Sequence, residues 1–314
     1  MPGYCLPVNK SRWGRLVLVC AVLGIAAVAG VVAVRQAGSD GTPASMATSS
    51  TPSTPPEVQE STPTPAPSAS ATSVDPMAAE NRVVLQNPLY QVGRIPASRC
   101  KEPTTRPTSV VKVKAYYTEF VSCLNKAWAP VIRKAGFEFQ APKLQVSSGP
   151  LADKAFCDIR SSAVYCNGTI YMHADFDLKN QRIHDPLWTR TTMAFLIAHE
   201  YGHHVQAMTG ILGASATRED YINGVDEHLA ESRRRELQAS CLSGVYLGAD
   251  KQFFPASGSW LQKWKYTVRN RGDEWNPQRD HGNKTNHGRW SQAGFDTADP
   301  ASCNTFTAKP ATVS

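Results

Sequence analysis

One stretch of the chain, TRTTMAFLIAHEYGHHVQAM from Thr189 to Met208, restricts the fold more than any other. It contains no proline, begins with threonine and is followed by Gly210 and Gly213, which predicts one helix of about five turns. Its first half is apolar on nearly every side, as is typical of a helix that passes through a core. Its second half carries three histidines and a glutamate. We therefore expect a buried helix that brings titratable groups to a site.

The spacing of these groups indicates metal binding. His199 and His203 are four residues apart, so both imidazoles lie on one face of the helix and can converge on one ion. Glu200 lies about 100° round the helix, where it can reach a water molecule on that ion without ligating it. This is the HExxH arrangement of zinc peptidases, and it predicts one Zn²⁺ ion as cofactor. Two hydrogen-bonded core histidines are the alternative.

Two residues beside the expected ligands, His204 and Gly202, are expected to have roles other than ligation. His204 lies off the face shared by His199 and His203, so a structural role or a contact with a ligand residue is expected in place of ligation. Gly202 inside a helix costs about 1 kcal/mol relative to alanine. Its presence indicates that another backbone or a substrate passes close by.

A third ligand is expected, because catalytic zinc usually takes three protein ligands and leaves one position for water. The next long helix predicted, Val225 to Tyr246, offers Glu227, Glu231 and Glu236. Glu236 directly precedes an apolar turn, so it lies where this helix begins to be buried. Glu231 lies beside the arginines at 233–235, which favours a solvated salt-bridging face.

The N-terminal part of the chain predicts a membrane anchor. Residues 16–34 are nineteen uncharged and almost wholly apolar positions, about the length of a helix that spans a bilayer. The stub 1–15 is basic and only Arg35 follows the span directly, so the positive-inside tendency places the stub in the cytosol and the rest outside. A cleaved signal peptide, and with it a secreted protein, is the alternative, but no convincing cleavage site follows.

The rest of the chain divides into two parts. Residues 35–80 are rich in Ser, Thr, Pro and Ala, which predicts a disordered linker. Residues 81–314 form the extracytoplasmic domain, whose six cysteines predict three disulfides. Cys157 and Cys166 flank a predicted hairpin and are expected to pair. No CxxC spacing supports a zinc-thiolate site.

The charge of the chain limits the partners that it is expected to bind. The net charge of +7 comes partly from the basic stub, and no basic stripe is interleaved with aromatic residues, so nucleic acid is not an expected partner. An envelope location favours contact with anionic cell-wall polymers.

Two further elements are predicted. The segment VYCNGTIYMH, from Val164 to His173, alternates β-formers around Asn167-Gly168, which is a hairpin signal. In proteins that resemble this chain in its HExxH motif, the zincins, the strand before the motif helix commonly lines the cleft and pairs with extended substrate. The resemblance therefore makes TIYMH the candidate for this role, and an ordinary sheet strand is the alternative. The segment from Ala115 to Ala135 predicts an amphipathic helix that Pro130 disturbs near its end.

The motifs together resemble a known family. The string HEYGHHVQ, followed some thirty residues later by RRELQASCLSGVY, is similar to the bacterial neutral zinc metallopeptidases, which carry HExGHHVQ and then ELQADCxAGVW. The segments VYCNGTIYM, DHGNKTNHGRWSQAG and ASCNTF extend the resemblance over about residues 87 to 306. It implies an α+β zincin-like domain, minimal and gluzincin-like, in which a small sheet packs on two metal-bearing helices.

The resemblance also implies roles. An endopeptidase acting on proteins or peptides would have Glu200 as general base, and the zinc ligands would be His199, His203 and Glu236. His281 matches the family's His-Gly and would steady the oxyanion. His287 is an equal rival by local sequence, although the intervals to the following Arg-Trp and Gly favour His281.

The chain departs from the family pattern at Ser240, where the family has aspartate. That carboxylate receives a hydrogen bond from a ligand imidazole, and loss of such a partner typically costs about 10 to 100-fold in metal affinity or activity. Ser240 can still accept the hydrogen bond, but without the charge. A weakened enzyme is expected, and a pseudopeptidase that serves as an envelope binding module is the alternative.

Overall fold

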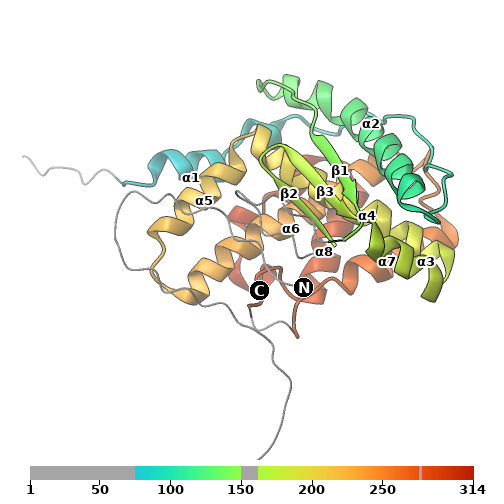
Figure 1. The fold of residues 1–314 in the computed structure, drawn as a ribbon. Coiled ribbons are helices and arrows are strands. Elements are labelled where there is room, and N and C mark those ends of the chain that lie inside the picture. The colour runs from blue at the N-terminus through green and yellow to red at the C-terminus, as the bar shows by residue number, and fades with distance from the viewer. Residues whose placement is uncertain (1–74, 150–161, 276–277) are drawn as a thin grey trace, which may run out of the picture. The chain divides into compact units, whose positions relative to one another are not determined.

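The computed structural model describes residues 75–149, 162–275 and 278–314. Within these ranges the fold is mostly helical with one small sheet (Figure 1). The α-helices are α1 (Ala78–Leu85), α2 (Val110–Lys134), α3 (Ala174–Ile183), α4 (Pro186–Met208), α5 (Ile211–Tyr221), α6 (Val225–Ala249), α7 (Gly258–Arg269) and α8 (Lys284–Thr297). The strands are β1 (Lys143–Ser147), β2 (Ala163–Cys166) and β3 (Thr169–His173). Short 3-10 helices are η1 (Pro88–Gln91), η2 (Pro300–Cys303), η3 (Thr305–Thr307) and η4 (Pro310–Thr312).

The predicted anchor at 16–34 lies outside the described residues, as does most of the linker predicted for 35–80. The last residues of that linker already belong to α1, which begins at Ala78. Across the ranges that the structure describes, no helix is both long enough and apolar enough to cross a bilayer.

Helix α4 is the predicted core helix. Every residue from Thr189 to Gln206 except Arg190 is buried. The helix begins earlier than predicted because Asp185 caps it, accepting a hydrogen bond of 2.9 Å from the Trp188 amide, and Pro186 suits the first turn. The start signal is therefore the Asp-Pro pair, which lies before the threonine-rich stretch.

Helix α6 packs against α4 at very close range. A Cβ atom on Gly202 would lie 2.6 Å from the carbonyl oxygen of Ala239 in α6, nearer than real Cβ atoms come. The expectation that another backbone passes close to Gly202 is confirmed. On another side of α6, Gly244 approaches α8 in the same way, because a Cβ there would lie 2.2 Å from the Ser291 carbonyl oxygen.

The sheet has the strand order β1-β3-β2, with β3 parallel to β1 and antiparallel to β2. Asn167 and Gly168 both have positive φ, 45° and 77°, which confirms the predicted hairpin turn between β2 and β3. The prediction that TIYMH pairs with substrate is wrong. This segment is the central strand β3, and both of its edges already bond to β1 and β2.

The placement of the sheet also corrects an expectation. Among the described elements the sheet contacts α4, α2 and α3, whereas α6 has α8 and α4 as its principal neighbours (Figure 1). The sheet therefore does not pack on both long helices of the core, because α4 lies between it and α6. The amphipathic helix predicted from Ala115 is α2, but it begins at Val110, five residues earlier, and Pro130 lies inside it, so the proline does not end the helix before Lys134.

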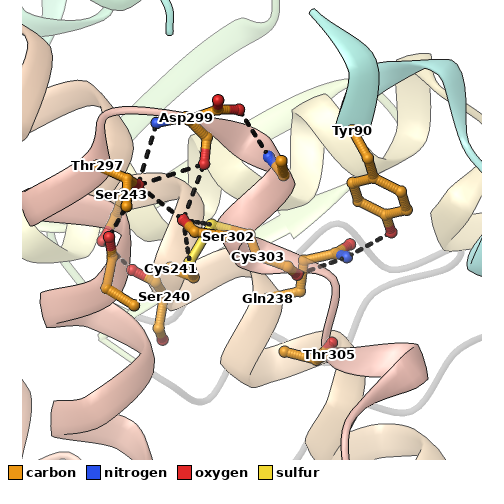
Figure 2. The surroundings of a disulfide bond; sticks show 12 residues. Tyr90, Gln238, Ser240, Cys241, Ser243, Thr297, Asp299, Ser302, Cys303 and Thr305 are labelled. Carbon is orange, nitrogen blue, oxygen red and sulfur yellow. Dashed lines mark hydrogen bonds between the residues drawn. A yellow bond between two sulfur atoms is a disulfide. The ribbon is translucent and has the colours of Figure 1, made fainter. Parts of the chain in front are cut away.

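Disulfides fasten the chain around this core. Cys100 is bonded to Cys123, and Cys241 in α6 to Cys303 in η2 (Figure 2). Cys166 is also disulfide-bonded, and Cys157, its predicted partner, lies outside the described residues.

Candidate metal centre

Three ligand atoms converge between α4 and α6. His199 and His203 of α4 bring their Nε2 atoms to 3.2 Å of each other, and each lies 3.3 Å from Glu236 Oε2 of α6. All three residues are buried, with at most 5% of each exposed. The group predicted from the HExxH spacing and the downstream glutamate is therefore assembled in the fold, and it is one of the sets that could hold a metal ion.

The separations fit zinc. Ligand distances of about 2.0–2.1 Å in a tetrahedral site place neighbouring ligand atoms about 3.3 Å apart. The observed separations of 3.2 and 3.3 Å match this value. Glu236 Oε2 is also fully buried and makes no hydrogen bond within the described part of the chain. A buried carboxylate oxygen of this kind needs a cation to compensate it.

The charge states of His199 and Glu236 suit ligation, whereas the pKa of His203, which burial lowers, is raised overall by Glu236. Burial lowers the pKa of His199 to about 4, so its imidazole is neutral at pH 7. Burial opposes the charged form of Glu236, but the attraction of His203 and His281 outweighs it and holds the pKa of that carboxyl well below its usual range. A neutral imidazole and a carboxylate are the forms in which these side chains bind metals.

Of the two other glutamates considered in α6, neither reaches the centre. Glu227 is exposed. Glu231 does form an ion pair, but the expectation of a solvated face is wrong, because only 3% of it is exposed. Its partner is Arg218 of α5, whose Nε lies 2.7 Å from Oε1, and not one of the adjacent arginines.

Glu200 follows His199 directly in α4 and is 2% exposed. Burial lowers the pKa of His203, but the charge of Glu236 and, after it, that of Glu200 raise it overall, so the Glu200 carboxylate lies near enough to act on this imidazole. This position agrees with a group that acts beside the metal without being one of the three converging ligands.

The outer nitrogen of His203 is held by an amide. Its Nδ1 lies 2.8 Å from Gln206 Oε1. Gln206 is itself fixed, because its Nε2 donates to the Arg235 carbonyl at 2.8 Å and to Gln238 Oε1 at 3.0 Å. Gln206 can therefore only accept from His203, which places the ring proton on Nδ1 and the lone pair on Nε2, the nitrogen that faces the centre. The spacing of His203 and Gln206 on one helix could have predicted this pair.

Gln238 extends this arrangement to the disulfide region. Its Nε2 donates to the Tyr90 hydroxyl at 2.8 Å and to the Cys303 carbonyl at 3.1 Å (Figure 2). The hydrogen bonds thus run from a ligand of the centre to the bonded pair Cys241–Cys303.

The outer nitrogen of His199 is held by Ser240. The Oγ of this fully buried serine lies 2.9 Å from His199 Nδ1. The expectation that Ser240 contacts a ligand imidazole is therefore confirmed. No carboxylate among the described residues takes that place. The same Oγ also lies 3.1 Å from Nε2 of His287 in α8.

His281 lies at the edge of the centre, in the loop before α8. Its Nε2 is 3.6 Å from Glu236 Oε2, and its Nδ1 donates to Asp280 Oδ1 at 2.7 Å. Burial lowers the pKa of His281, but Glu236 and Asp280 outweigh it and raise the value to about 9. The backbone of His281 donates to Asp273 at 2.6 Å, which anchors the loop. The sequence analysis did not single out these aspartates, although Asp280 is adjacent to the histidine.

His204 has the structural role expected of it. Its Nε2 lies 2.7 Å from the Gln140 carbonyl oxygen and its Nδ1 3.2 Å from the Tyr165 hydroxyl. These contacts connect α4 to β2 and to the loop before β1, and they do not involve the metal centre.

Comparison with known proteins agrees with this geometry. A family model described as "Putative neutral zinc metallopeptidase" matches residues 91–257. The uncharacterized protein YpfJ of Escherichia coli K12 is 30% identical over 202 residues, which cover 57% of this chain and 66% of that protein. The uncharacterized protein Rv2575 of Mycobacterium tuberculosis is 31% identical over 134 residues, covering 36% of this chain and 44% of that protein. The chain thus spans less than two thirds of the length of these relatives. No solved structure gives a significant match.

The matched segment contains all three converging ligands, whereas His281 and His287 lie beyond its end. Because the family model covers more than half of the 314 residues, and its span includes the buried His-His-Glu group, the chain belongs to the family of neutral zinc metallopeptidases.

Proposed function

We propose that the chain is a zinc endopeptidase that cleaves proteins or peptides outside the cell while an N-terminal helix at residues 16–34 anchors it in the membrane. The observation that carries the proposal is the buried group of His199, His203 and Glu236, whose ligand atoms are spaced for a tetrahedral zinc ion. The membrane location rests on the amino-acid sequence alone.

The reaction follows from the groups around the centre. Zinc held by His199, His203 and Glu236 would supply an acidified water molecule and polarise the scissile carbonyl. Glu200, buried beside the ligands, would take the proton from that water as it attacks and pass it to the leaving amine. His281, whose Nε2 borders Glu236, would stabilise the negative charge that develops on the carbonyl oxygen.

Replacing Glu200 by glutamine tests the proposal. The variant is expected to bind zinc like the wild type but to cleave an unfolded protein about 10² to 10⁴-fold more slowly, because only the proton transfer is lost. The measurement is zinc content and cleavage rate of the full-length chain in a mild detergent. Glu227→Gln is the matched control, since Glu227 is exposed in α6 and should leave both values unchanged. A zinc-free wild type, or a Glu200→Gln variant that cleaves at the normal rate, would overturn the peptidase assignment.

Ser240 favours a second function, an envelope binding module with little catalysis. Both outer imidazole nitrogens of the centre contact uncharged groups, Ser240 and Gln206, where a carboxylate would increase the basicity of the ligand. In that case the wild type would retain its fold and fail to cleave.

Ser240→Asp is therefore expected to strengthen zinc binding by about 10 to 100-fold, because a carboxylate would accept the hydrogen bond of His199 Nδ1 with a full charge. Competition with a chromogenic chelator measures the change. An affinity equal to that of the wild type would show that the charge at this position does not tune the metal.

A further inference from the structure

The hydrogen bond between Ser240 and His199 has a direction that the serine alone does not fix. His199 Nε2 can bind zinc only if Nδ1 carries the ring proton and donates it to Ser240 Oγ. A hydroxyl can equally donate to Nδ1. The ring proton would then sit on Nε2, facing Glu236, and would block the ligand position. Gln206 has no such ambiguity toward His203, because its amide is oriented by the Arg235 carbonyl.

His287 is placed to settle this direction. Only 2% of it is exposed, and its Nε2 lies 3.1 Å from Ser240 Oγ. Burial holds the pKa of His287 well below its usual value, so the ring is neutral and carries one proton and one lone pair. Its Nδ1 has no hydrogen-bond partner among the described residues, so Ser240 meets the ring at Nε2, which can accept when Nδ1 carries the proton. No other acceptor for the Ser240 hydroxyl is found among the described residues. The proton of that hydroxyl can therefore point either to His287 or to His199.

The packing keeps His287 at this distance. Helix α8 approaches α6 through glycines, among them Gly244, whose Cβ position would overlap the Ser291 carbonyl. The Phe195 ring of α4 lies against His287, with ring centroids 5.8 Å apart. The imidazole is thus enclosed by three helices and cannot move away from Ser240 without disturbing them.

We propose that His287 is a positioning residue for the zinc centre: its Nε2 accepts the Ser240 hydroxyl proton, which makes Ser240 an acceptor for His199 Nδ1 and leaves His199 Nε2 free for the metal. Ser240 and His287 together then do what one carboxylate does in other zinc sites, since a carboxylate can only accept. The inference rests on the proposed zinc site and concerns metal affinity, so it can be tested without measuring cleavage.

The test is a set of His287 variants in the full-length chain, with zinc affinity measured by chelator competition. His287→Phe removes the acceptor, and His287→Leu does so without added volume, in case the larger ring prevents folding. Both are expected to weaken zinc binding by about 10-fold or more. His287→Gln is the matched control, because its Oε1 can accept at a reach close to that of Nε2, and it should bind zinc nearly like the wild type. Circular dichroism and thermal unfolding confirm that each variant is folded.

The decisive comparison repeats His287→Phe and His287→Leu in chains that carry Ser240→Asp. In the Ser240→Asp chain, the carboxylate accepts the hydrogen bond of His199 Nδ1 whether or not His287 is replaced. The loss of zinc affinity caused by the His287 substitutions should therefore largely disappear. An equal loss in both backgrounds would show that His287 only supports packing and would overturn the inference. The inference would also be overturned if His287→Phe and His287→Leu bound zinc as tightly as the wild type in chains that keep Ser240. A wild-type chain that binds no zinc would instead refute the proposed function together with this inference.

Discussion

Replacing Glu236 by glutamine is expected to weaken zinc binding by about 100-fold or more. Apparent binding free energies of about 10–16 kcal/mol for zinc in four-ligand sites give roughly 3 kcal/mol per ligand, and each 1.4 kcal/mol is tenfold in affinity. Glu236 is also the one charged member of a group in which its carboxylate oxygen lies 3.3 Å from both imidazole nitrogens. Without it, the charge of a buried divalent ion would face neutral ligands only. The measurement is zinc affinity of the full-length chain.

Glu231→Gln provides the control for this experiment. Glu231 lies on the same helix and is equally buried, but it pairs with Arg218 and has no contact with the centre. Its loss should lower the stability of the chain, since Arg218 is left without its partner, while zinc affinity stays the same. If both variants bind zinc as well as the wild type, Glu236 is not a ligand, and the third ligand must come from another residue.

Replacing Gly202 by alanine is expected to destabilise the fold and to weaken the metal centre in one step. The added Cβ atom would lie 2.6 Å from the Ala239 carbonyl oxygen and 2.9 Å from its Cα, so α4 and α6 must separate. Such overpacking typically costs about 1–3 kcal/mol, and occasionally more, in the free energy of unfolding. Alanine is otherwise the better helix former by about 1 kcal/mol, so any loss measured is a lower limit for the collision.

The expected loss of zinc affinity in Gly202→Ala follows from the positions of the ligands. His199 and His203 belong to α4 and Glu236 to α6, so separating the helices moves the two halves of the site apart. Denaturant unfolding and zinc titration of the same variant measure both effects. Gly213→Ala in α5 is the matched control, because nothing lies within 4 Å of a Cβ there. It should be neutral or up to about 1 kcal/mol more stable. Equal behaviour of the two variants would contradict the close contact between α4 and α6.

Several elements of this structure follow from local patterns. The helix that bears His199 and His203 was predicted because its apolar run and its spacing are properties of one segment, and α4 confirms it. The hairpin at Asn167-Gly168 was predicted for the same reason, since turn chemistry is local. Gly202 also predicted a closely packed neighbour, which is confirmed, but nothing in the sequence around it identified that neighbour as Ala239.

Other features depend on which segments meet. TIYMH has the composition of a strand, but its central position in the sheet comes from pairing with β1, some twenty residues before it, and this excludes the expected pairing with substrate. Glu231 was expected on a solvated face because arginines follow it. It is buried because α5 folds back and places Arg218 against it.

The sequence by itself predicted the candidate metal ligands on α4, the helix that carries the third candidate and, through the family resemblance, Ser240 as the departure from the family pattern. The first two conclusions depend on helical periodicity, which fixes the face on which a side chain lies. Only the tertiary structure decided what surrounds those ligands. It placed Glu236 Oε2 3.3 Å from both imidazoles, and it brought His287 within 3.1 Å of Ser240 from a helix forty-odd residues further along. The reason is that hydrogen-bond partners across helices are selected by packing, and periodicity within one segment carries no information about it.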